Sequence, residues 1–168
     1  TLSSEAYSGI YKYYYRVDGG EWQELSGNTF TATETGEHKY EFKAESYAAL
    51  ESNVTAFTVK IDRQVPVIRV SFEGTFGRWT GEGVTFNFST EEASLSGINY
   101  YYDNGNGWTL IDSGTSIEIT DTTNAVYRFK AVNNAGTESY PSDSYHVMID
   151  AKVPEITLTP EVTDVTPN

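Results

Sequence analysis

Residues that could carry out catalysis are few in this chain, and they form no catalytic pattern. The two histidines, His38 and His146, belong to no zinc-spaced pair and to no nucleophile motif. Cysteine is absent, which removes thiol catalysis and thiolate metal sites. We interpret both histidines as solvated strand residues and predict that the chain is not an enzyme.

Carboxylates are abundant, with 24 Asp and Glu against 11 Lys and Arg, but their positions indicate no active site. A glycosidase needs two carboxyl groups that converge across a cleft, and a small all-β domain offers none that is obvious. A phosphate-binding glycine loop joins a strand to a helix, and the glycine-rich segment 74–83 lacks that context. We predict this segment to be a loop that joins two strands.

Two aspartates, Asp62 and Asp150, are the candidates for metal binding. Each lies four residues before a proline, in Asp62-x-x-x-Pro66 and Asp150-x-x-x-Pro154. Calcium bound there would bridge adjacent domains, although calcium needs six to eight oxygen ligands and each Asp has a basic residue close by. The alternative is a short joint without metal, because proline stiffens its own backbone and that of the residue before it.

Aromatic residues are the candidates for ligand binding. Tyr11, Tyr14, Trp22 and Trp108 could stack on a sugar ring or on a partner protein if they face solvent. Strand alternation predicts that Tyr14 points outward and that Tyr13, Tyr15 and Val17 point inward, whereas the direction of Tyr11 depends on a bulge after Ile10. The alternative is ordinary cross-strand packing.

The charge and hydropathy of the chain exclude two classes of partner. The net charge is −13 and is spread along the chain, so the protein repels phosphate backbones and we expect no nucleic-acid partner. No run approaches the eighteen apolar residues that cross a bilayer, so we expect no membrane insertion of this segment.

The elements that position these residues occur twice, about 88 residues apart. Matching blocks recur in the same order: Tyr40–Ala44 as Tyr127–Ala131, Ser8-Gly9-Ile10 as Ser96-Gly97-Ile98, Trp22 as Trp108, and Ile61-Asp62 as Ile149-Asp150. A period of this length corresponds to one small domain. We predict a repeat over 1–62 that lacks its first two strands, a complete repeat over 63–150, and the start of a further repeat over 151–168.

Alternating apolar residues and turn residues predict that each repeat is built of strands alone. In the second repeat we expect seven strands, at Val67–Phe72, Val84–Phe88, Ile98–Tyr102, Trp108–Leu110, Ile117–Ile119, Val126–Val132 and Tyr145–Ile149. Seven short strands in about 85 residues is the count of an immunoglobulin-like sandwich.

A pattern in the sixth strand supports this interpretation. Immunoglobulin domains carry a Tyr two residues before a core Cys, and its hydroxyl ties down the preceding corner. Tyr40-x-Phe42 and Tyr127-x-Phe129 have that spacing, with Phe in place of Cys. We therefore predict a tyrosine corner in each repeat and a phenylalanine ring between the two sheets.

These motifs resemble the bacterial immunoglobulin-like repeats. The resemblance rests on Ser-Gly-Ile, on Tyr-x-Val-Asp-Gly-Gly-x-Trp at Tyr15–Trp22, on the block Gly36–Ala44, and on Ile-Asp-x-x-x-Pro. It includes the hairpin Ala131–Gly136, in which a glycine supplies a left-handed turn position. The first repeat departs from the family there, with Ala44–Ala49, so we expect a different turn.

The resemblance implies an all-β fold of tandem Greek-key sandwiches in secreted or cell-surface bacterial proteins. It implies a non-catalytic structural or adhesive role, as a stalk, an adhesin segment or a spacer, at an extracellular or cell-surface location. Two alternatives stay open: a module that binds a glycan or a host protein through exposed Tyr and Trp, and an accessory region of a secreted enzyme. Apart from calcium, no cofactor is expected.

The partners that we expect are neighbouring repeats of the same protein. Because the first repeat lacks two strands, its sandwich would leave an unpaired edge and apolar surface. We therefore also predict that residues 153–159 of one copy fill this gap in another copy by strand exchange.

Overall fold

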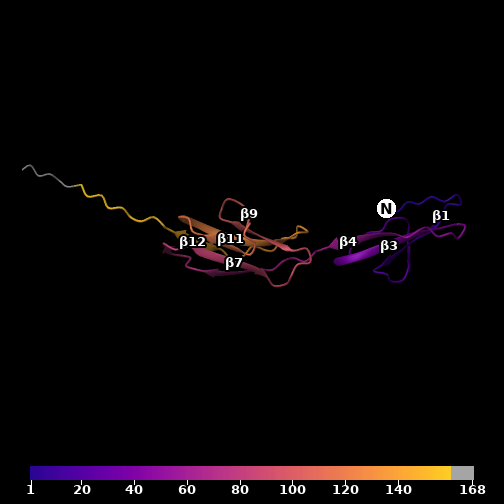
Figure 1. Ribbon diagram of the computed structural model, residues 1–168, viewed down its shortest axis with the longest axis horizontal. Coiled ribbons are helices and arrows are strands. Elements are labelled where there is room, and N and C mark those ends of the chain that lie inside the picture. The colour runs from indigo at the N-terminus through magenta and orange to yellow at the C-terminus, as the bar shows by residue number, and fades with distance from the viewer. Residues whose placement is uncertain (160–168) are drawn as a thin grey trace, which may run out of the picture. The chain divides into compact units, whose positions relative to one another are not determined.

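A computed structural model describes residues 1–159 of the chain, and these residues contain strands and loops but no helix (Figure 1). The prediction of an all-β fold is confirmed. The predicted start of a further repeat, 151–168, lies partly outside the described residues. Its described part, 151–159, contains no strand and is exposed throughout.

Packing divides the chain into two compact units. The first contains residues 1–67, 90–99 and 131–140, and the second contains residues 68–89 and 100–130 together with the chain from 141 onward. Both units draw on residues of the second sequence repeat. The predicted domain boundaries at 62/63 and 150/151 stay a prediction.

The first unit is built on one antiparallel sheet of four strands, in the order β2-β1-β3-β4. Its strands are β1 (Ile10–Val17), β2 (Gln23–Leu25), β3 (Gly36–Ser46) and β4 (Thr55–Ile61). The register of β1 against β3 shifts between Ile10 and Lys12, so the bulge that would decide the direction of Tyr11 is present. From Lys12 onward the two strands pair residue for residue.

One face of this sheet is apolar and carries Tyr13, Tyr15, Tyr40 and Phe42. The ring of Phe30 packs on three of them, with its centroid 4.6 Å from that of Tyr15, 5.2 Å from that of Tyr40 and 5.5 Å from that of Phe42. Among residues 1–159 no second sheet belongs to this unit. Phe57, on the same face of β4, is 60% exposed as a result.

The second unit contains two sheets packed face to face (Figure 1). One has the order β10-β7-β5 and the other the order β6-β12-β11-β8-β9. The bounds are β5 (Ile68–Glu73), β6 (Trp79–Thr80), β7 (Val84–Thr90), β8 (Ile98–Asp103), β9 (Thr109–Leu110), β10 (Ser116–Ile119), β11 (Thr123–Asn133) and β12 (Tyr145–Ile149).

This strand order is that of an immunoglobulin-like sandwich. The first, second and fifth of the seven predicted strands form one sheet, and the third, fourth, sixth and seventh form the other. The eighth strand, β6, was not predicted. It lies in the glycine-rich segment that we expected to be a loop, and it pairs in parallel with β12 through Trp79 and Thr80.

Aromatic rings fill the space between the two sheets. Phe129 on β11 is fully buried, and its ring lies 4.8 Å from those of both Phe86 and Phe88 on β7. The prediction that a phenylalanine fills the inter-sheet space is thus confirmed for the second unit. Tyr145 on β12 closes the same cluster, 5.1 Å from Phe86.

The tyrosine corner is wrong for the first repeat. Tyr40 is buried, and its hydroxyl has no hydrogen-bond partner among the described residues. Burial, followed by the charges of Glu34 and Asp18, raises the pKa of this hydroxyl. The ring is held by Phe30 and not by a hydroxyl contact to the corner.

The hairpin turn that follows β3 also differs from expectation. Ala49 adopts a left-handed backbone with φ of 59°, and Gly136 adopts φ of 88° at the equivalent position. The turn hydrogen bonds match, from Ala49 N to Ser46 O and from Gly136 N to Asn133 O, both 2.9 Å. The two repeats therefore share one turn, and in the first an alanine occupies the position that favours glycine.

Candidate functional sites

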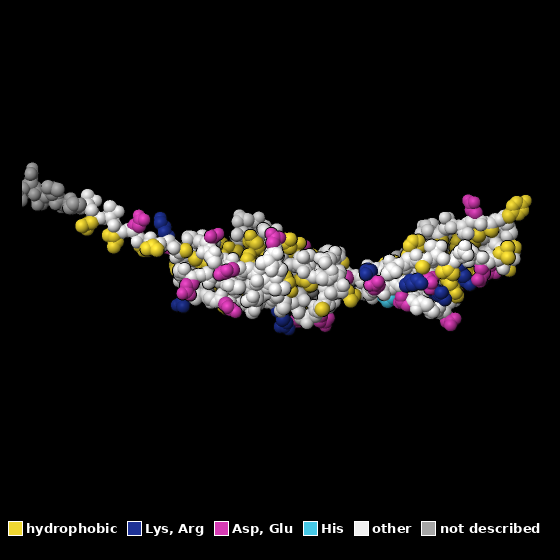
Figure 2. Space-filling model, in the orientation of Figure 1, with side chains coloured by type: hydrophobic (Ala, Val, Ile, Leu, Met, Phe, Trp, Pro, Cys, Tyr) yellow, Lys and Arg dark blue, Asp and Glu magenta, His cyan; other side chains and the backbone are white. Residues whose placement is uncertain are grey.

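On the outer face of the first sheet, two cations lie beside Trp22. The Arg16 guanidinium lies 4.7 Å from the centroid of the indole ring and the Lys43 ammonium 4.8 Å. Arg16 also pairs with Glu41 at 2.8 Å, and Lys43 pairs with Glu51 at 2.6 Å. Figure 2 shows basic and acidic side chains side by side on the visible surface of this unit.

Tyr14 lies on the same face, as alternation predicts, and its polar end is bound. The hydroxyl donates to Glu45 at 2.8 Å, and this bond, followed by desolvation, raises the pKa of Tyr14. Lys43 lies 5.5 Å from the ring centroid. Tyr11, at the bulge, is 50% exposed and packs against Tyr47 with 5.4 Å between ring centroids.

Trp108 repeats the arrangement of Trp22 in the second unit. Its indole is 36% exposed, and the Lys130 ammonium lies 4.8 Å from the ring centroid and 5.7 Å from that of Tyr101. The structure thus brings Tyr14 and Trp22 together around Lys43 in the first unit, whereas Trp108 belongs to the other unit. Ligand binding by Tyr11, Tyr14, Trp22 and Trp108 stays a prediction.

Asp62, at the end of β4, is the centre of a polar cluster in the first unit. The carboxylate is only 8% exposed. Its Oδ2 accepts hydrogen bonds from the Ser94 hydroxyl at 2.6 Å, from the Ser96 hydroxyl at 2.7 Å and from the Ser96 amide at 3.0 Å. Its Oδ1 accepts from the amide of Gln64 at 3.1 Å.

These four donors stabilise the charged form of the carboxyl group. The hydroxyls of Ser94 and Ser96 are the largest contributions, and together with the two amides they lower the pKa of Asp62 to about 2. Asp62 is therefore ionised at every physiological pH. The network fixes the start of the linker 62–66 onto the turn at Ser94–Gly97.

Further hydrogen bonds hold the chain that follows Asp62, at Gln64 and Val67. The Gln64 side chain donates to Glu92 at 2.7 Å, and the Gln64 carbonyl accepts from the Asn133 side chain at 3.1 Å. The Val67 carbonyl accepts from the Glu91 amide at 3.1 Å. Every residue in this set belongs to the first compact unit.

Asp150 has the same local geometry but fewer partners. Its Oδ1 accepts from the Lys152 amide at 3.0 Å, as Asp62 accepts from the Gln64 amide. Among residues 1–159 no side chain donates to its Oδ2. Unlike Asp62, Asp150 is exposed.

Calcium binding at Asp62 or Asp150 gains no support from the geometry. Within residues 1–159 no three His, Cys, Asp or Glu side chains gather in a way that could hold a metal ion. The partners of Asp62 are all hydrogen-bond donors, whereas calcium needs oxygen ligands that point their lone pairs at it. Calcium dependence stays a prediction, which thermal melting with and without calcium tests.

The two histidines occupy different environments. Nδ1 of His38 lies 2.8 Å from Oδ2 of Asp18, and this contact, followed by the Thr35 carbonyl, raises the pKa of His38. His38 is therefore more than a solvated strand residue, because it ties β3 to the turn after β1. His146 is exposed and lies 2.7 Å from Asn124.

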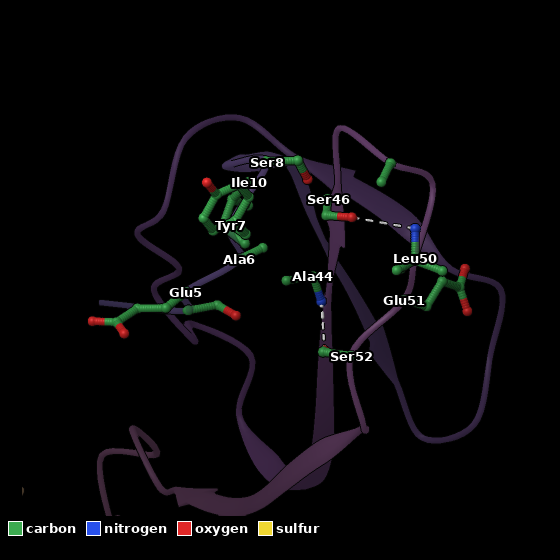
Figure 3. A pocket seen from close by; sticks show the side chains of 12 residues that line it. Glu5, Ala6, Tyr7, Ser8, Ile10, Ala44, Ser46, Leu50, Glu51 and Ser52 are labelled. Carbon is green, nitrogen blue, oxygen red and sulfur yellow. Dashed lines mark hydrogen bonds between the residues drawn. The ribbon is translucent and has the colours of Figure 1, made fainter.

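A shallow groove of about 410 Å³ lies beside β1 and β3 in the first unit (Figure 3). Its wall includes Tyr7, Ile10 and Leu50, and the acidic residues Glu5 and Glu51 lie at opposite sides of it. Two of the serines that line it accept backbone amides: Ser52 from Ala44 at 2.9 Å and Ser46 from Leu50 at 3.3 Å. The groove brings together no acid–base pair.

Comparisons with known proteins give matches among solved structures only. No family model and no curated protein matches the chain. Among solved structures it is similar to the fibronectin(III)-like modules of CbhA from Clostridium thermocellum, with 16% identity and a TM-score of 0.41 over 94% of this chain and 87% of that one. It is also similar to the D00-D0 domain of Intimin, with 9% identity and a TM-score of 0.30 over 86% of this chain and 88% of that one.

The fold assignment therefore rests on the sheet topology. Within the described residues there is no helix of the length and hydropathy that spanning a membrane requires.

Proposed function

We propose that this chain is a non-catalytic structural segment of a secreted or cell-surface bacterial protein, in which immunoglobulin-like repeats act as a stalk or spacer. The observation that carries the proposal is the Asp62 cluster. A linker between domains is by default exposed and mobile. Here the linker carboxylate is buried and accepts four hydrogen bonds, three of them from the turn at Ser94–Gly97.

The linker chemistry fits a mechanical role. Pro66 is buried and fixes its own backbone angle, and it restricts Val65 to extended conformations. Side chains of the second repeat, Ser94 and Asn133, hold the Asp62 carboxylate at the end of the first repeat and the Gln64 carbonyl that follows it. A spacer needs such a fixed linker, because a flexible linker does not keep the domains that it connects at a defined distance or in a defined direction.

The glycan-binding alternative needs a free ring face. Trp22 already has the cations Arg16 and Lys43 beside it, and Trp108 has Lys130, so a glycan must use the part of each ring that these cations leave open. A glycan array tests the alternative directly, and binding that is lost in Trp108→Ala would favour it.

Limited proteolysis with trypsin tests the fixed linker, because Arg63 provides a cleavage site inside it. We expect the wild-type chain to resist cleavage after Arg63, since cutting requires the local backbone to unfold. Asp62→Ala should be cleaved there many times faster. Cleavage after Lys152, in the exposed segment 151–159, provides the internal control and should be fast in both proteins.

Asp150→Ala is the matched control variant, because it removes the same residue type from the equivalent position. It should leave the rate of cleavage after Arg63 unchanged. If wild-type chain is cleaved after Arg63 as fast as after Lys152, the linker is not held and the proposed role fails.

A further inference from the structure

Asp62 and Asp150 have the same local structure, but only Asp62 accepts hydrogen bonds from a serine–glycine turn. Each follows an Ile at the end of the last strand of a repeat and precedes a proline by four residues. In each, Oδ1 accepts the amide two residues ahead, at 3.1 Å for Asp62 and 3.0 Å for Asp150. Oδ2 of Asp62 accepts three hydrogen bonds from the Ser94–Gly97 turn, and Oδ2 of Asp150 accepts none from the described side chains.

The turn at Ser8–Gly9 repeats the turn that Asp62 binds. Gly9 has φ of 81° and Gly97 has φ of 89°. The Gly9 amide donates to the Ala6 carbonyl at 2.9 Å, as the Gly97 amide donates to the Ser94 carbonyl at 3.4 Å. The hydroxyl of Ser8, which corresponds to that of Ser96, is exposed and has no hydrogen-bond partner among residues 1–159.

We infer that the Asp150 carboxylate binds a serine–glycine turn in the same way as Asp62 does, and that this turn belongs to another repeat of this kind. Asp150 and that turn would then form a second joint, like the one at Asp62. A second copy of this chain presents such a turn at Ser8–Gly9 and is the partner that can be tested. The Ser8 hydroxyl and amide would donate to Oδ2 of Asp150, as those of Ser96 donate to Asp62. This inference rests on the structural role proposed above.

The residues that flank the two halves fit the same docking. In the occupied joint the Gln64 side chain donates to Glu92 at 2.7 Å. Lys152 is the residue equivalent to Gln64, and Ser4 is the residue equivalent to Glu92. Glu5 follows Ser4 directly. Docking would therefore place a lysine beside a glutamate.

The contact between copies is weaker than the Asp62 joint. Ala6 stands where Ser94 stands, so one of the three hydrogen bonds to Oδ2 is missing. Two separate molecules also lack the high effective concentration that a covalent linker provides. The two surfaces differ, so repeated contacts of this kind join copies into open chains or rings.

Cross-linking between two single-cysteine variants tests the inference, because the chain has no cysteine of its own. A tagged Ser4→Cys variant is mixed with an untagged Lys152→Cys variant and treated with a short bismaleimide reagent. We expect the mixed dimer to form several-fold faster than with Asp112→Cys as the second partner. Asp112 is, like Lys152, an exposed position in the second unit.

Asp150→Ala within the Lys152→Cys variant should lower the rate of mixed-dimer formation to that of the Asp112→Cys control. Equal rates for Lys152→Cys and Asp112→Cys, or a rate that Asp150→Ala leaves unchanged, would overturn the inference. Neither outcome affects the trypsin experiment on Arg63. The inference on Asp150 can therefore fail while the proposed function stands, and the two experiments distinguish these results.

Discussion

At the scale of single residues, Ala49 is the clearest case of a residue in a backbone conformation that its side chain disfavours. An L-residue in the left-handed region costs about 1–2 kcal/mol relative to its ordinary conformations, and glycine avoids this cost. We predict that Ala49→Gly raises the free energy of unfolding by about 1 kcal/mol, measured by urea denaturation.

Ala48→Gly is the control for that variant. Ala48 has no positive φ, so glycine there adds freedom to the unfolded chain without relieving strain and should lower stability slightly. Equal effects of the two substitutions would show that Ala49 is not strained.

The second prediction at this scale concerns acid. The pKa of Asp62 in the folded chain is about 2, below its ordinary value of 3.8, so its ionised form stabilises the fold. That stabilisation is fully present above pH 3.8 and is lost as the pH falls toward 2. Asp62→Asn removes the titration, so the stability difference between wild type and Asp62→Asn should shrink over this range.

Urea denaturation at several pH values between 6 and 2 would measure this difference. A difference that stays constant over the range would contradict the assigned role of the carboxylate.

At the scale of elements, the two units differ in how their aromatic faces are covered. Phe86 on β7 is fully buried between two sheets, whereas Phe57 on β4 is 60% exposed. We predict that Phe86→Ala costs about 3–5 kcal/mol, because it removes a buried ring and leaves a cavity. Phe57→Ala should cost much less in the same denaturation experiment, and a similar cost for both would mean that the Phe57 face is covered in solution.

Local patterns were enough to predict the regular strands of the second repeat. Alternation along Val84–Phe88, for example, reflects burial of one face, and this is visible in the sequence. The two-residue strand β6 was missed because its pairing with β12 depends on tertiary position and not on local pattern. The left-handed turn at Ala49 was missed because alanine gives no signal for it.

The candidate sites were only partly accessible from sequence. The repeated Asp-x-x-x-Pro pointed to Asp62, and alternation placed Tyr14 on the outer face. The serines that bind Asp62 lie more than 30 residues away, and no spacing rule connects them to it. The pairing of Trp22 with Lys43 depends likewise on the register of β1 against β3, which the sequence does not state.

At the scale of the whole molecule, the strand exchange predicted from the sequence would be a separate form of self-association. Val153, Ile156 and Leu158 are at least 79% exposed, so their apolar side chains are available to another copy. Removing residues 151–168 would abolish strand exchange and would leave Asp150 in place. Sedimentation of the full and shortened chains would distinguish the two contacts.

Fixation of the linker on the Ser94–Gly97 turn by Asp62 can be measured directly as a distance. Spin labels at cysteines introduced for Thr33 and Tyr140, both exposed and both in the first unit, report on it through the width of the distance distribution between them. We predict a single narrow distribution in the wild-type background and in Asp150→Ala, and a broad one in Asp62→Ala. A broad wild-type distribution that Asp62→Ala leaves unchanged would contradict the account.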